Sequence, residues 1–136
     1  MAISAAIGGL ACGPGKVLAQ SAAAPVHHHG NPDVFDAANG CVGAGTACLA
    51  HCIMLLAGGD TSMADCAQTV VQMRAVLEGV AAVAAIGGKN LSELVKVAAK
   101  FCADCEAACR KHEAQHPTCK ACAEACAKAV AVFAKA

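Results

Sequence analysis

The apolar residues of this chain, mostly alanine, valine, leucine and cysteine, do not alternate with polar residues in the period of two that marks a half-buried strand. Glycine pairs and prolines instead divide the chain into four stretches with helical character. We predict helices over about residues 33–57, 62–86 and 91–112, and a fourth from Pro117 to the C-terminus. Because strand signals are absent, the predicted fold class is all-α.

Residues of the helix-capping type lie at these boundaries. Asp33 and Ser62 are the expected N-caps of the first two helices, and each of these helices ends at a pair of glycines. The third helix should start after Asn90, where Glu93 completes a capping box, and Pro117 suits the first turn of the fourth. Because the connections have only about three to five residues, we expect an up-down antiparallel four-helix bundle.

Cysteine follows helical spacings in three of these predicted helices. A Cys-x-x-Cys-x-x-x-Cys pattern occurs in the third helix and again in the fourth, and the first helix has cysteines at spacings of seven and four. At about 3.6 residues per turn, each set falls on one stripe of its helix. One more cysteine stands near the start of the second helix. The ten candidate ligands are Cys41, Cys48, Cys52, Cys66, Cys102, Cys105, Cys109, Cys119, Cys122 and Cys126.

In an up-down bundle these ten positions meet at one end, so the core should have two different halves. One half is lined with thiols. The other half is an ordinary hydrophobic plug, for which the expected residues are Leu77, Val80, Val83, Leu94, Val97, Val130 and Phe133. The thiol end also carries His51, Met54 and Met63 as further candidate ligands, whereas His112 and His116 are interpreted as solvated turn residues.

Several roles for the sulfur are open. Cysteine can fill a core as a small hydrophobe, but ten such residues on common stripes make this a poor account. Disulfides within a helix are disfavoured because residues three or four apart hold their Cβ atoms about 5–6 Å apart. Zinc sites are usually closed and tetrahedral, and iron–sulfur clusters need four cysteines around one point, which a pair of facing helices could still supply. Copper(I) fits best, because it is soft and accepts sites of two or three thiolates.

Three motifs resemble those of the bacterial copper storage proteins, a family of cysteine-rich four-helix bundles. They are Cys41-x6-Cys48-x-x-His51-Cys52, Ser62-Met63-x-x-Cys66 and the repeated cysteine pattern of the last two helices. The resemblance implies that several Cu(I) ions per chain are stored by pairs of cysteines inside the bundle. It also implies uptake at an open end lined by histidine and methionine, and a homo-oligomer, suggested to be a tetramer.

Two positions depart from the family's pattern. His51 and Met63 match the open end, but Met54 lies one position from Leu55, where a methionine of the entrance would be expected. Leu77 stands where some exported members carry another cysteine. Both departures suggest fewer sites and a leaner entrance than in other members.

The remaining sequence features limit the range of functions. The formal net charge is zero, and tryptophan and tyrosine are absent, so a nucleic-acid partner is not expected. Residues 1–24 are interpreted as the remnant of an export signal, although no arginine pair is present, and residues 25–32 as a flexible linker containing His27, His28 and His29. The bundle would then occupy residues 33–136, with no membrane span and a periplasmic location, or alternatively a cytoplasmic one.

The favoured function is therefore non-enzymatic storage of copper(I). No catalytic triad, phosphate loop or dinucleotide fingerprint is found. The two alternatives are an iron–sulfur electron carrier and a copper chaperone that carries a single ion.

Overall fold

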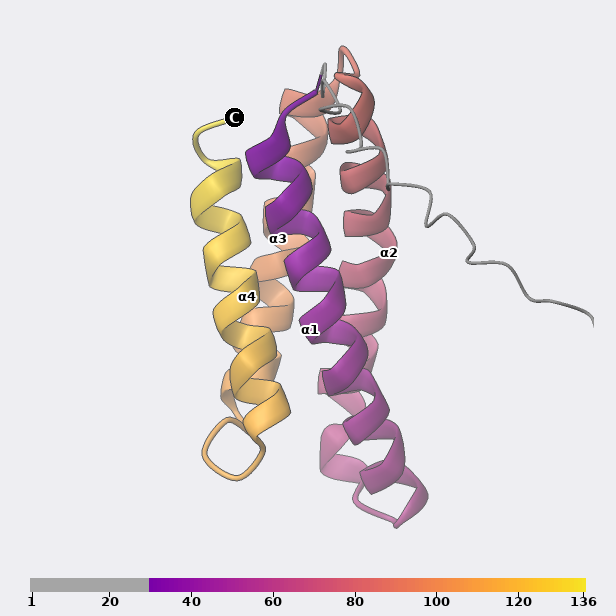
Figure 1. Ribbon diagram of the computed structural model, residues 1–136. Helices are drawn as coiled ribbons and strands as arrows, with labels where there is room; N and C mark the ends of the chain where they lie inside the picture. Colours follow the sequence, from indigo (N-terminus) through magenta and orange to yellow (C-terminus); the bar gives the residue numbers. More distant parts are fainter. Residues whose placement is uncertain (1–29) are drawn as a thin grey trace, which may run out of the picture.

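A computed structural model describes residues 30–136. The predicted export signal and the histidines at 27–29 lie outside these residues. The described chain forms four α-helices, which are α1 (Pro32–Ala57), α2 (Ala64–Ile86), α3 (Leu91–Arg110) and α4 (Pro117–Phe133), with a 3-10 turn η1 (Thr61–Met63) before α2. Figure 1 shows the helices running alternately up and down, which confirms the predicted all-α antiparallel four-helix bundle.

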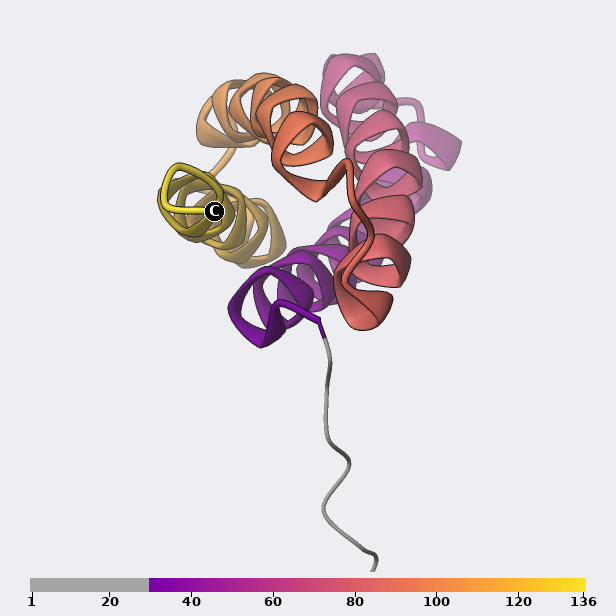
Figure 2. The same ribbon diagram turned by 90° about the horizontal axis from the view of Figure 1, so that it is seen from above.

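The four helices form a ring in which each packs against two neighbours. Helix α1 contacts α2 and α4, and α3 contacts the same two helices, so that α1 faces α3 diagonally across the core. The view along the bundle in Figure 2 shows this ring. The α1–α2 and α3–α4 connections lie at one end, and the α2–α3 connection lies at the other (Figure 1). We call these the double-loop end and the plug end.

The starts of two helices differ from the prediction. Helix α1 begins one residue earlier than expected, because the Asn31 side chain rather than Asp33 accepts a hydrogen bond from the Val34 N–H at 3.1 Å. At η1, Asp60 is the cap: its carboxylate accepts from the Ser62 N–H at 3.1 Å and from the Ser62 hydroxyl at 2.6 Å. The prediction of Ser62 as the N-cap was wrong, because the carboxylate before it takes the acceptor role.

At the boundary between α2 and α3, the predicted glycine stop is confirmed and the predicted capping box is wrong. Gly87 ends α2 in the left-handed conformation at φ 69°, and its N–H returns to carbonyls of the last turn, as expected for a glycine stop. The Asn90 side chain makes no capping hydrogen bond. The predicted capping box is therefore not formed, and Glu93 pairs instead with Lys96 at 2.8 Å on the exposed surface.

The core has the expected two halves. At the plug end the buried side chains are hydrocarbon, and they include Val34, Leu77, Val80 and Phe133. The expectation for Val97 was wrong, because this side chain is 48% exposed. On α3 the inward stripe runs through Val95, Ala98 and Cys102, and a residue two positions after Val95 points about 200° away from it.

Two segments could cross a membrane by length and composition alone, namely Pro32–Ala57 and Thr61–Ile86. This is weak evidence, because helices that enclose the core of a soluble protein pass the same test. Both segments present their cysteines to the bundle core, and the absence of a membrane span stays a prediction.

Candidate metal centre

The ten candidate cysteines all lie in the core. Nine of them are fully buried and Cys41 is 1% exposed. Among residues 30–136 every cysteine is a free thiol. Among the hydrogen-bonded thiol pairs the shortest Sγ–Sγ distance is 3.4 Å, between Cys41 and Cys126. A disulfide bond is much shorter, at roughly 2.05 Å. The described bundle is therefore not held together by cystines.

The thiols form four groups, in each of which all sulfur atoms lie within 4.8 Å of one another. From the double-loop end inward, the groups are Cys48–Cys52–Cys66–Cys119, then Cys48–Cys109–Cys122, then Cys105–Cys122–Cys126, and finally Cys41–Cys102–Cys126. Each group shares one cysteine with the next, namely Cys48, Cys122 and Cys126. The groups therefore join into one continuous sulfur column through the inside of the bundle.

Direct contacts connect the thiols along this column. Cys48 is 3.7 Å from Cys119 and 3.9 Å from both Cys66 and Cys109. Cys66 in turn lies 3.5 Å from Cys109. Sulfur atoms at such distances can share one metal ion, because two metal–sulfur bonds of about 2.3 Å span up to about 4.6 Å.

The local sequence explains why the sulfur atoms line up. The spacings of three, four and seven keep each cysteine set on the inner face of its helix. The repeated pattern occurs on the neighbouring helices α3 and α4. Because these helices are antiparallel, the first cysteine of one copy lies at the same level as the last cysteine of the other. The middle cysteines of the two copies, Cys105 and Cys122, then stand opposite each other at 3.8 Å.

Hydrogen bonding among the thiols lowers the pKa of some cysteines and raises the pKa of others. Donation from Cys102 and Cys126 lowers the pKa of Cys41 to about 5, and donation from Cys105 and other neighbours lowers the pKa of Cys122. Hydrogen bonding with Cys109 raises the pKa of Cys48, and burial raises the pKa of Cys52 to about 11. A few thiolates are thus stabilised by protonated neighbours. Since no buried side chain of the described residues is polar or basic, further thiolates need a metal cation as their counter-charge.

The double-loop end brings two histidines together. His51 Nε2 lies 2.9 Å from His116 Nδ1, and the His112 ring centroid is 6.3 Å from that of His116. The sequence interpretation of His116 as a solvated turn residue missed this contact. The available signal was its place immediately before Pro117, at the same end of the bundle as His51.

The two candidate methionines at this end differ in environment. Met63 is fully buried at the end of η1, three residues before Cys66, whereas Met54 is 67% exposed on the outer face of α1. Both stay predictions as ligands, and the exposure of Met54 places it outside the sulfur column.

A further sulfur atom lies at the inner end of the column. Met73 is fully buried, and its Sδ is 3.6 Å from Cys41 Sγ. Met73 was not among the ligands predicted from the sequence. The signal was its spacing of seven residues from Cys66, which places both on one stripe of α2.

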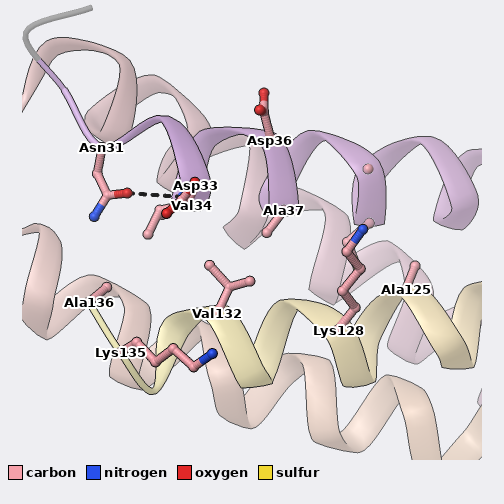
Figure 3. Close-up of a pocket in the computed structure, with 12 residues that line it drawn as sticks. Asn31, Asp33, Val34, Asp36, Ala37, Ala125, Lys128, Val132, Lys135 and Ala136 are labelled. Carbon is pink, nitrogen blue, oxygen red and sulfur yellow. Dashed lines mark hydrogen bonds between the residues drawn. The ribbon is translucent and has the colours of Figure 1, made fainter.

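A groove of about 570 Å³ runs between α1 and α4 near the plug end (Figure 3). Asp33 and Asp36 line it from α1, and Lys128 and Lys135 line it from the α4 side. Cys41 also lines this groove.

The donor set is that of a soft metal, since thiolates and thioethers select Cu(I), zinc and iron–sulfur clusters. One group offers four thiols around a point, and it is drawn from α1, α2 and α4 rather than from the facing pair of α3 and α4. The other three groups have three thiols each and share members, which suits a row of ions better than separate four-cysteine clusters.

Comparison with known proteins gives one match. A model of a family described as copper storage protein matches residues 27–134. This range covers the whole described bundle except its last two residues. No curated protein matches the chain.

Proposed function

Because this chain belongs to the copper storage protein family, we propose that it stores several Cu(I) ions along its sulfur column. The observation that carries this proposal is the sharing of Cys48, Cys122 and Cys126 between successive thiol groups. A carrier of one ion needs a single group. A continuous column accommodates many ions, each within reach of two or three sulfur atoms.

Charge supports a monovalent ion. Ten bare thiolates in a core without buried basic groups would be prohibitively unfavourable. Two thiolates around one Cu(I) leave about one negative charge per site, and a thiolate that bridges two ions lowers this further. Ten thiols used in separate pairs hold about five ions, and bridging raises that number.

Loading must also release protons. Most of the thiols have a raised pKa and are protonated at neutral pH. The hydrogen bond with Cys126 lowers the pKa of Cys102, for example, but the hydrogen bond with Cys41 and burial together raise it to about 12. Each ion that binds two such thiols displaces up to about two protons. Copper uptake should therefore become weaker as the pH falls.

The double-loop end is the proposed entrance for copper. His51 and His116 lie in contact there, part-buried, above the four-thiol group that contains Cys52 and Cys119. An imidazole pair of this kind can receive an ion and pass it to the first thiols. Met63 is proposed as an assisting thioether, and its burial three residues before Cys66 supports this.

The protein is proposed to act without catalysis, as a store rather than an enzyme. Membership of a storage family supports this, and the ten thiols of the described core face one another. Export to the periplasm and assembly into a tetramer are further proposals, which rest on residues 1–24 and on the family resemblance.

Titration of the reduced, metal-free protein with Cu(I) under anaerobic conditions tests this function. Ions bound per chain are measured by metal analysis after separation from a competing chelator. Several ions per chain are expected, about half the thiol count or more. One ion per chain would instead indicate a chaperone, and a brown protein after aerobic purification would indicate an iron–sulfur cluster, because Cu(I) thiolates are colourless in visible light.

A further inference from the structure

The inner end of the sulfur column is built by one sulfur atom from each of the four helices. Cys41, Met73, Cys102 and Cys126 are, on α1 to α4 respectively, the last sulfur-bearing core residues before the hydrocarbon plug. Beyond them the inward positions are hydrocarbon, such as Ala38 on α1 and Leu77 on α2.

Met73 belongs to this ring by distance. Its Sδ lies 3.6 Å from Cys41 Sγ, which is comparable with the 3.4 Å between Cys41 and Cys126. The three thiols also lie within 4.8 Å of one another. The distance from the Met73 thioether to the Cys41 sulfur is therefore similar to the distances between neighbouring thiols of the column.

A buried glycine provides room for this methionine. A Cβ atom added at Gly45 would lie 2.8 Å from the terminal methyl carbon of Met73, whereas one added at the exposed Gly43 would meet nothing within 4 Å. Glycine inside a helix is unfavourable compared with alanine. At position 45 it lets the Met73 side chain lie against α1, with its sulfur beside Cys41.

On the basis of the proposed storage function, we propose that Met73 is a Cu(I) ligand, and that its thioether completes an innermost site with Cys41, Cys102 and Cys126. Thioethers are soft donors for Cu(I) and carry no charge. At the end of the column that borders the hydrocarbon plug, a neutral donor adds a bond to copper without adding another buried anion. Met73 would thus be more than a core residue that fills space.

The test replaces methionine by selenomethionine in the full chain, loads the protein with Cu(I) and examines selenium by X-ray absorption. A copper neighbour of selenium is expected, and the copper signal on selenium should fall in Met73→Leu, a substitution that nearly conserves volume. The comparison variant Met63→Leu removes the other fully buried methionine, and the copper neighbour that Met73 provides should remain in it.

The outcomes separate this assignment from the storage function. If the protein binds several Cu(I) ions but Met73→Leu keeps the full copper signal on selenium, or if no such signal exists, Met73 is not a ligand and storage stands. If the wild-type chain binds no Cu(I), both are overturned. Should Met73→Leu fail to fold, Gly45→Ala replaces it, because it pushes the Met73 methyl away and should reduce the signal, while Gly43→Ala should not.

Discussion

Cys48, like Cys122 and Cys126, belongs to two thiol groups, so a single substitution there should remove more copper than one at an unshared cysteine. Its sulfur belongs to the four-thiol group at the double-loop end and also to the next group inward, with Cys109 and Cys122. Cys52, one turn along the same helix, belongs to the four-thiol group alone. Both side chains are fully buried, so that Cys48→Ala and Cys52→Ala form a matched pair.

The expected magnitudes follow from this difference in membership. Cys48→Ala leaves three thiols in the four-thiol group and only two in the group with Cys109 and Cys122, so capacity should fall by about one ion more than in Cys52→Ala. Cys52→Ala takes one donor from a group that keeps three thiols, so that about one ion or none should be lost. In the metal-free protein each substitution deletes one buried sulfur atom and should cost a similar amount of stability, about 1 kcal/mol.

The assay is anaerobic Cu(I) titration of both variants and the wild type, with metal and protein measured after gel filtration. Far-UV circular dichroism and chemical denaturation of the metal-free variants check that both bundles remain folded. Equal capacities of the two variants, at equal helicity, would contradict the reasoning, because the sharing of Cys48 between groups would then have no consequence for storage.

Four further predictions can be tested with the same preparation. Reduced, metal-free protein should already be helical, because the plug end packs without any thiol, and a coil spectrum in the far ultraviolet would contradict this. His51→Ala and His116→Ala should each slow Cu(I) uptake in stopped-flow mixing while leaving the final loading nearly unchanged, and wild-type rates in both variants would remove the pair from the entrance. In metal-free protein, iodoacetamide should modify Cys41 first, since it borders the groove and its pKa is lowered from 9.0 to about 5. Its modification rate, read by peptide mass spectrometry, should rise as the pH passes about 5 and level off near neutrality, whereas an ordinary thiol would still be gaining rate towards pH 9.0. Gly43→Ala should stabilise the protein by about 0.5–1 kcal/mol in urea denaturation, whereas Gly45→Ala should not, because its new methyl group meets Met73.

Among the helix ends, some boundaries were predicted correctly from local sequence and others were not. The glycine stop at Gly87 was predicted correctly, because a left-handed residue after a helix is a local conformational requirement. The N-cap at Ser62 was wrong because Asp60 caps the preceding turn η1 instead, and the capping box at Glu93 was wrong because Asn90 makes no capping hydrogen bond and Glu93 pairs with Lys96. Local sequence does not show whether Asp60 or Ser62 takes that role.

The sequence by itself determined two features: the periodicity of the cysteines in three helices predicted their inward stripes, and the short connections of an up-down bundle predicted that all ten cysteines meet at one end. The spacings of three, four and seven residues can be read from the sequence, and on a helix residues at these spacings lie on one face. Which thiols from different helices share a group depends on the axial register and rotation of each helix, and both depend on how the side chains of the whole core pack together. Only the tertiary structure therefore decided that Cys48, Cys122 and Cys126 link the groups, that His116 meets His51, and that Met73 lies beside Cys41.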